Sequence, residues 1–349
     1  MAYISFKPTD HFNTKLYTGN GSTNAITGVG FQPDFTWIKK RDATEGHKLF
    51  DSARGVTKLV QSSSSNAEQT NATSLTAFGA DGFTLGSAGI TNNNTNTFVS
   101  WNWKGGTTSG ITTNGSTTIT PSTYSFNATS GVSILNYTGN MTAGAKLAHG
   151  MGKTPKFWAC KNISNTESWT CYHQAIGNGK FMTLNGTNAA TTASNRWNDT
   201  DPDSVNITLG AETSVSGTGT DNMLCYAFCD VKGFASFGKF QGNASATNSP
   251  YIYTGFEPAM VIIKRSDGAN SWGMKTAKTQ VYNVADVTLF ANATGAESAF
   301  SGNQVDLLSN GFKIRTTSSD FNTNGGNYIY MAWAENPIVG SDGTPGLAR

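Results

Sequence analysis

Few residues of this sequence have the types and spacing that enzymatic chemistry needs. None of its histidines lies beside a serine or cysteine nucleophile motif or in a His-x-x-x-His pair, so we expect structural roles for them. Glycoside hydrolysis needs two carboxylates at a fixed separation, which a sequence does not reveal. The histidines are His11, His47, His149 and His173. The carboxylates considered are Glu45, Asp51, Glu167 and Asp199. For Asp51 we favour a local ion pair with Arg54 or a helix cap, and we predict no catalytic residue.

Three carboxylates at alternate positions form the one weak candidate for a metal site. Asp199, Asp201 and Asp203 could surround Ca²⁺ with oxygen ligands. An EF-hand loop would need glycine at its sixth position and glutamate at its twelfth, where Ser204 and Gly210 stand. The alternative, a surface loop rich in Asx-turns, is the interpretation that we prefer.

Three tryptophans lie in segments rich in Ser, Asn and Gly, and are the candidates for ligand binding. Sugar rings stack on exposed indole faces, and asparagine-rich loops supply hydrogen bonds. Equally, a tryptophan in such a loop can be buried at a contact between domains or subunits. The sequence leaves both interpretations open for Trp169, Trp197 and Trp272.

Charge and hydropathy exclude several classes of function. The net charge is +2 and the sequence contains no basic cluster, so nucleic-acid binding is not expected. Apolar runs are too short for a membrane span, and the first residues lack the apolar core of a signal peptide. We therefore expect synthesis in a cytoplasm, without membrane insertion.

These candidate residues must be positioned by a unit that recurs three times. A glycine, a proline and an apolar run ending in lysine recur at residues 28–39 (GVGFQPDFTWIK), 150–161 and 253–264, with the lysine always six residues after the proline. Glycine and proline mark turns, and the apolar run indicates a buried strand. Lys39, Lys161 and Lys264 should therefore lie at equivalent edges of three related domains.

Short alternating segments punctuated by Gly, Asn and Asp predict an all-β fold of three tandem, jelly-roll-like β-sandwiches. The expected parts are an N-terminal arm (1–13), repeat 1 (14–105), a Gly/Ser/Thr-rich linker (106–131), repeat 2 (132–235), repeat 3 (236–337) and an extended tail (338–349). All cysteines fall in repeat 2, so they do not form a shared disulfide framework, and we expect small buried apolar side chains. They are Cys160, Cys171, Cys225 and Cys229.

Four segments of the first repeat together resemble a family. The segments are residues 17–21 (YTGNG), 28–39, 49–55 (LFDSARG) and 98–104 (FVSWNWK). They are similar to a repeat domain in structural proteins of marine tailed bacteriophages, which is linked to concanavalin-like or SPRY-like sandwiches. The likeness is strongest over residues 15–105 and looser in the other repeats, which lack the Phe-Asp-Ser-Ala-Arg-Gly block. It implies a virion component and brings no catalytic residue with it.

From the resemblance and the polar loops we predict a non-enzymatic virion structural protein on the particle exterior, as an oligomeric tail fibre or spike that attaches to host glycans. The alternatives are a head decoration or tail-scaffold protein and, third, a polysaccharide depolymerase. Expected partners are other virion proteins, copies of itself and a host-surface glycan. No cofactor is expected, and Ca²⁺ at the aspartate run is a weak alternative.

Overall fold

The computed structural model describes residues 3–299, 302–340 and 343–344. Antiparallel strands dominate it, which confirms the all-β prediction. In the described ranges the helices are one 3₁₀ turn, η1 (Pro8–Asp10), and three single-turn α-helices, α1 (Gly89–Asn92), α2 (Ser194–Trp197) and α3 (Thr213–Ser216).

Repeat 1 combines a large sheet, a smaller sheet and a short ribbon. The large sheet has the order β1 (Phe12–Thr18), β9 (Thr97–Trp103), β3 (Phe35–Lys40) and β4 (Lys48–Asp51). The small sheet has the order β2 (Asn24–Ile26), β8 (Gly82–Leu85) and β7 (Leu75–Gly79). The ribbon pairs β5 (Lys58–Leu59) with β6 (Gln69–Thr70).

Repeat 2 has a longer large sheet and a two-stranded small sheet. The large sheet has the order β10 (Thr123–Asn127), β11 (Val132–Thr138), β18 (Asn222–Phe228), β13 (Phe157–Asn162), β14 (Thr170–His173), β15 (Lys180–Thr183) and β16 (Thr191–Thr192). The small sheet pairs β12 (Ala145–Ala148) with β17 (Asn206–Leu209).

Repeat 3 follows the same plan. Its large sheet has the order β19 (Ala235–Gln241), β27 (Asn327–Pro337), β21 (Phe256–Arg265), β22 (Gly273–Thr276), β23 (Val287–Phe290) and β24 (Ser298–Ala299). Its small sheet has the order β20 (Tyr251–Tyr253), β26 (Gly311–Ile314) and β25 (Val305–Leu308). In all three repeats the opening strand pairs with the closing strand, and the closing strand pairs with the lysine-ended strand.

The middle strands of each large sheet are buried on both faces, because one face contacts the central core and the other contacts the interior of its own repeat. Side chains alternate between the faces of a strand. In β3, Phe35 and Trp37 join a central core while Ile38 faces the small sheet of its own repeat. The closing strand β9 was expected to be half-buried, but Phe98 to Trp103 are all buried. The difference arises because the other repeats cover the face that a lone sandwich would expose.

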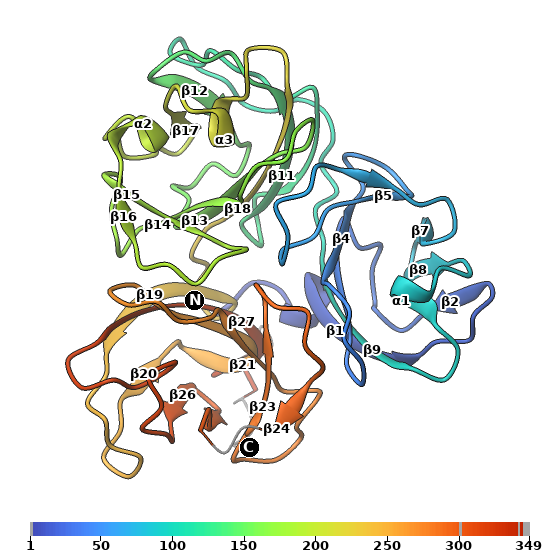
Figure 1. Cartoon of the computed structure of the whole chain (residues 1–349), viewed down its shortest axis with the longest axis vertical. Helices are drawn as coiled ribbons and strands as arrows, with labels where there is room; N and C mark the ends of the chain where they lie inside the picture. The colour runs from blue at the N-terminus through green and yellow to red at the C-terminus, as the bar shows by residue number, and fades with distance from the viewer. Residues whose placement is uncertain (1–2, 300–301, 341–342, 345–349) are drawn as a thin grey trace.

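The three repeats surround one shared core, which Figure 1 shows as three lobes around a common centre. The interiors of repeats 1 and 2 form clusters of their own between large and small sheet. The interior of repeat 3, including Ile252 and Phe312, is continuous with the central core. The repeats are thus joined by apolar packing and not only by linkers.

The segments expected to be extended pack against these lobes. In the arm, Ile4 is buried, and the Tyr3 hydroxyl donates to the Gly255 carbonyl at 2.8 Å. The segment 106–131, expected as a linker, contributes β10 to the edge of the large sheet of repeat 2. Of the expected tail 338–349, residues 341–342 and 345–349 lie outside the described residues.

A Gly-Asn pair recurs at residues 19–20, 139–140 and 242–243, and there is a steric reason for its glycine. A Cβ atom on Gly19, Gly139 or Gly242 would collide with the backbone that follows the small helix or turn of its repeat. For Gly139 the obstructing atoms are the carbonyl group of Ser216 and the nitrogen of Gly217. Only glycine allows this close approach of two backbones.

Candidate functional site

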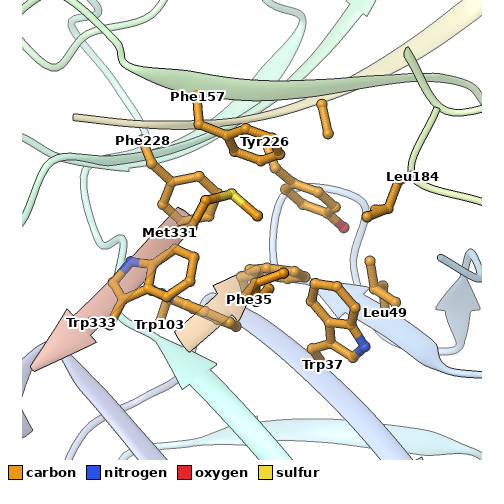
Figure 2. A pocket seen from close by; sticks show the side chains of 12 residues that line it. Phe35, Trp37, Leu49, Trp103, Phe157, Leu184, Tyr226, Phe228, Met331 and Trp333 are labelled. Atoms are coloured by element: carbon orange, nitrogen blue, oxygen red, sulfur yellow. The ribbon is translucent and has the colours of Figure 1, made fainter. Parts of the chain in front are cut away.

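The central core contains the largest concentration of aromatic side chains, and it joins the three repeats. Figure 2 shows rings from all three repeats around a small hollow, with Phe35, Tyr226 and Trp333 among them. The cavity has a volume of about 30 Å³ and an apolar lining. Phe35 stacks on Tyr226 with ring centroids 4.2 Å apart. Room for about one water molecule does not suit an organic ligand, so this cavity is part of the scaffold.

The repeated lysines lie at the seams between repeats. Lys161 Nζ of repeat 2 donates to the Ser65 carbonyl of repeat 1 at 3.1 Å. Lys264 of repeat 3 reaches Thr187 of repeat 2 at 3.2 Å. Lys39 of repeat 1 reaches Thr294 of repeat 3 at 3.3 Å, which closes the cycle. The sequence predicted that these lysines lie at equivalent edges of the repeated unit. In the structure, each of these edges contacts the neighbouring repeat.

Each lysine also donates to the carbonyl of the residue that follows it, at 2.6 to 2.7 Å. All three are almost completely buried. Burial lowers the pKa of each ammonium group to about 8, and for Lys161 the nearby Glu167 partly opposes that shift. These lysines are enclosed by backbone carbonyls and have no access to a substrate.

Backbone hydrogen bonds repeat the same cycle. Glu167 N donates to Ser65 O at 2.9 Å, and Glu68 N donates back to Ile163 O at 3.0 Å. At the seam between repeats 3 and 2, Asn270 N donates to Thr187 O and Ala190 N donates to Ser266 O. At the seam between repeats 1 and 3, Glu45 N donates to Thr294 O and Glu297 N donates to Arg41 O. The chain is therefore a closed ring of three seams built from corresponding residues.

Two of the predicted ligand-binding tryptophans belong to these seams, so that prediction is wrong for them. Trp169 and Trp272 lie eight residues after Lys161 and Lys264, and both are fully buried. Trp169 Nε1 donates to the Gln61 carbonyl of repeat 1 at 2.8 Å, and Trp272 Nε1 to the Thr183 carbonyl of repeat 2 at 2.9 Å. Of the two interpretations left open by the sequence, burial at a contact between repeats is the correct one.

His47 occupies the corresponding position of repeat 1. Its Nδ1 accepts a hydrogen bond from Trp37 Nε1 at 2.7 Å, so the ring proton is on Nε2 and points to the Phe290 carbonyl of repeat 3 at 3.1 Å. Burial, with the charge of Lys39, holds the pKa of His47 well below its usual range. The imidazole is a neutral donor in a third copy of the tryptophan contact.

Trp197, the third predicted ligand-binding tryptophan, is also buried, and the prediction is wrong there too. It lies at the end of α2 and packs edge-on against Trp158 with ring centroids 5.1 Å apart. Its Nε1 donates to the Lys180 carbonyl at 3.0 Å. The indole fills the core of repeat 2, because the polar loop around it folds over an apolar interior.

The aspartate run does not converge on a metal position. Asp203 Oδ1 accepts hydrogen bonds from the backbone of Val205 and Asn206, both at 2.7 Å, which is an Asx-turn. Asp201 accepts from Asn178 Nδ2 at 2.9 Å. Residues 3–299, 302–340 and 343–344 contain no cluster of three His, Cys, Asp or Glu that could hold a metal ion, so Asp199, Asp201 and Asp203 give no support to the Ca²⁺ alternative, and the Asx-turn of Asp203 agrees with the surface loop that we preferred.

The remaining histidines and the cysteines have structural surroundings. His149 and His173 each accept a backbone hydrogen bond two residues ahead and point Nε2 at a carbonyl. Burial lowers the pKa of His173 to about 4. All four cysteines are buried and unpaired, as expected for small apolar side chains. Cys160 and Cys225 lie opposite each other on neighbouring strands.

Three of the four carboxylates considered for hydrolysis, Glu45, Asp51 and Glu167, make other contacts. Asp51 is fully buried, with Arg54 Nε at 2.6 Å and the Tyr226 hydroxyl of repeat 2 at 2.7 Å. This confirms the ion pair expected for Asp51 and Arg54. Glu45 pairs with Lys48 at 2.9 Å, and Glu167 accepts from the Thr213 hydroxyl at 3.0 Å.

Exposed aromatic side chains occur instead on the small sheet of repeat 3. Tyr251 and Tyr253 are 45% and 58% exposed, while Ile252 between them is buried. The two rings thus share the outer face of β20. The Tyr251 hydroxyl donates to Asn310 Oδ1 at 2.6 Å. Burial and a hydrogen bond to Tyr253 raise the pKa of the adjacent Tyr3 to about 12.

Comparison with family models assigns the chain to one family. The model described as "Domain of unknown function (DUF7483)" matches residues 7–337. The chain belongs to this DUF7483 family. No curated protein and no solved structure matches the chain significantly. No helix of the described residues is long and apolar enough to cross a membrane.

The sequence contains a signal for Tyr251 and Tyr253, although neither was among the predicted ligand-binding residues. The segment Tyr-Ile-Tyr between Pro250 and Thr254 has the period of a half-buried strand, which predicts that both rings face outward. Tyr253 is also the first residue of the third copy of the recurring motif (residues 253–264), and that motif has a structural role. In this DUF7483 chain the exposed pair Tyr251 and Tyr253 lies at the edge of the repeated motif and not in its buried strand, and Tyr282, which is also exposed, lies outside the motif.

Proposed function

We propose that this DUF7483 protein is a non-enzymatic structural protein on the exterior of a tailed-phage virion, built from three β-sandwich domains, where it binds a host-surface glycan as part of a tail fibre or spike. The phage assignment rests on the sequence resemblance over residues 15–105. The observation that supports the binding role concerns the residues that recur in all three repeats. These residues form the contacts at the seams and in the central core.

A ring with three interlocked seams is a rigid support for a surface that differs between copies. Loops and outer strand positions tolerate change because they contribute little to the core. Recognition on such a scaffold is therefore expected at positions that do not recur. The side chains of the outer small-sheet faces satisfy this condition.

As the runner-up, a head decoration or tail-scaffold protein, the chain would clip onto neighbouring subunits through the arm 1–13 and the tail 336–349. The described part of the arm packs on its own chain instead, where Tyr3 bonds to Gly255 and Phe6 contacts Phe234. A depolymerase, the third alternative, would need a free carboxylate pair, while Asp51, Glu45 and Glu167 are engaged in other contacts.

Location and adsorption test the proposal. Cryo-electron microscopy of the particle should place the protein at the tail tip or on a fibre, and particles lacking it should adsorb poorly to host cells. Purified protein should bind glycans on an array and release no sugar from host polysaccharide. Equal adsorption with and without the protein would refute the attachment role.

A further inference from the structure

The outer face of the small sheet in repeat 3 has the side chains of a saccharide-binding surface. Tyr251 and Tyr253 are two residues apart on β20, so their Cα atoms lie about 7 Å apart along the strand and their side chains leave the same face. Both rings are about half exposed. Aromatic faces at this spacing can contact the apolar faces of successive sugar rings.

Polar groups surround the two rings. Tyr251 lies opposite Lys313 on β26, and Lys313 lies opposite Asp306 on β25. Asp306 pairs with Arg315 at 2.9 Å. Asn310 accepts from the Tyr251 hydroxyl through Oδ1, which directs its amide Nδ2 away from that bond. Hydroxyl, amide and ammonium groups around flat rings suit a ligand with many hydroxyl groups and small apolar faces.

The other repeats do not have this surface. The strand pairs Ile26–Phe83, Leu147–Ile207 and Ile252–Phe312 correspond. In repeat 1 the first residue of this pair lies between Ala25 and Thr27, and in repeat 2 it lies between Lys146 and the buried Ala148. In repeat 3 it lies between the two tyrosines. A scaffold role would predict similar residues in all copies.

The residue before the glycine that begins β8 in repeat 1 and β26 in repeat 3 also differs between these repeats. In repeat 1 it is Asp81, whose carboxylate accepts hydrogen bonds from Gly28 N and Gly30 N at 2.9 and 2.7 Å. In repeat 3 it is Asn310, which holds the corresponding turn through its backbone carbonyl. Its side chain is thereby freed to orient Tyr251.

We infer that the outer face of β20, with Tyr251, Tyr253 and Asn310, binds a pyranose-containing polysaccharide of the host surface. This inference rests on the proposed function and assigns its site. A purely apolar protein partner would not fit, because charged side chains lie on the same face. Repeat 3 is then the recognition repeat, and repeats 1 and 2 support it.

The test uses the full chain in which Tyr251 and Tyr253 are both replaced by Ala. Binding to the host polysaccharide, measured by calorimetry, should weaken about tenfold or more. The double replacement by Phe retains both rings and should bind within a few-fold of the wild type. Thr27→Ala, at the corresponding exposed position of repeat 1, is the matched control and should bind normally. Thermal unfolding shows whether each variant is folded.

The outcomes separate this inference from the function on which it rests. If the wild-type protein binds no saccharide, the glycan-attachment function fails, and this inference fails with it. If the wild type binds and the folded Ala variant binds equally well, the site is elsewhere while the function stands. Loss of incorporation into particles with unchanged saccharide binding would instead make this face a protein contact, and would overturn the inference.

Discussion

Lys161 Nζ lies 3.1 Å from the carbonyl oxygen of Ser65, across the seam between repeats 2 and 1. The same bond joins the other two pairs of repeats, so the ring is closed by three buried ammonium groups. A lysine is rarely buried because its charge loses hydration. Here two or more carbonyl acceptors around each nitrogen replace water.

The seam lysines predict a pH dependence of stability. Burial lowers their pKa to about 8, while a lysine in the unfolded chain has a pKa near 10.5. Between these values the unfolded state binds more protons than the folded state, so the free energy of unfolding rises with pH. Lys161→Met should reduce that slope by up to about 1.4 kcal/mol per pH unit. Urea unfolding of both proteins from pH 8 to 9.5 measures it, because the ionisation of Cys and Tyr in the unfolded chain is common to both proteins and cancels in the difference between the slopes.

The control for this experiment is Lys232→Met, because Lys232 lies over the Tyr3 ring at the surface. It should leave the slope unchanged. Identical slopes for the wild type and Lys161→Met would show that the seam lysine keeps its proton throughout the range.

The seam tryptophans predict a cost specific to their hydrogen bonds. Trp169→Phe removes the Nε1 donor and leaves the Gln61 carbonyl at the seam without that bond. Trp158→Phe is the matched control, because Trp158 is equally buried and its Nε1 has no hydrogen-bond partner. We expect Trp169→Phe to be more destabilising than Trp158→Phe by about 1–3 kcal/mol. Chemical denaturation of the two variants compares them, and equal losses would mean that the indole contributes volume alone.

The strands could be predicted from the sequence because the repeat and the alternation act over short distances. The lysine-ended strands, the Gly-Asn turns and the Asp51–Arg54 pair all depend on residues close in the chain. The seams depend on partners far apart, such as Trp272 and Thr183, and no local pattern reports them. Polar composition left both exposure and burial open for Trp169 and Trp272, and the structure buries them because the loops of neighbouring repeats cover each other.

The spacing of the repeat itself indicates the burial of two of these tryptophans. Trp169 and Trp272 lie at the same distance from the repeated lysine, and a recurring position indicates scaffold. Trp197 has no such counterpart, and its burial depends on the core of repeat 2. The mutual arrangement of the three sheets could not be predicted, because burial on both faces follows from assembly of the whole ring.

Gly139, the glycine of the recurring Gly-Asn pair in repeat 2, predicts a steric effect of a single substitution. Gly139→Ala places a Cβ atom against the Ser216 carbonyl group, so a backbone segment must move. We expect a loss of about 3 kcal/mol or more in stability. Gly115→Ala is the control, since a Cβ there meets no atom within 4 Å. Similar melting temperatures for both variants would contradict this account.

The Asp51–Arg54 pair predicts the largest electrostatic effect in the chain. Arg54 is buried and also contacts Glu68 at 3.1 Å and the Tyr226 hydroxyl at 3.2 Å, so it links repeats 1 and 2. Arg54→Met leaves the Asp51 carboxylate buried without its cation, which should cost about 3–5 kcal/mol. Adding Asp51→Asn removes that stranded charge and should recover part of the loss. Arg265→Met, which breaks the more exposed Arg265–Asp267 pair, should cost at most about 1 kcal/mol. Urea unfolding of these variants beside the wild type tests this order, and a double variant no more stable than Arg54→Met would place the cost in lost packing instead of charge.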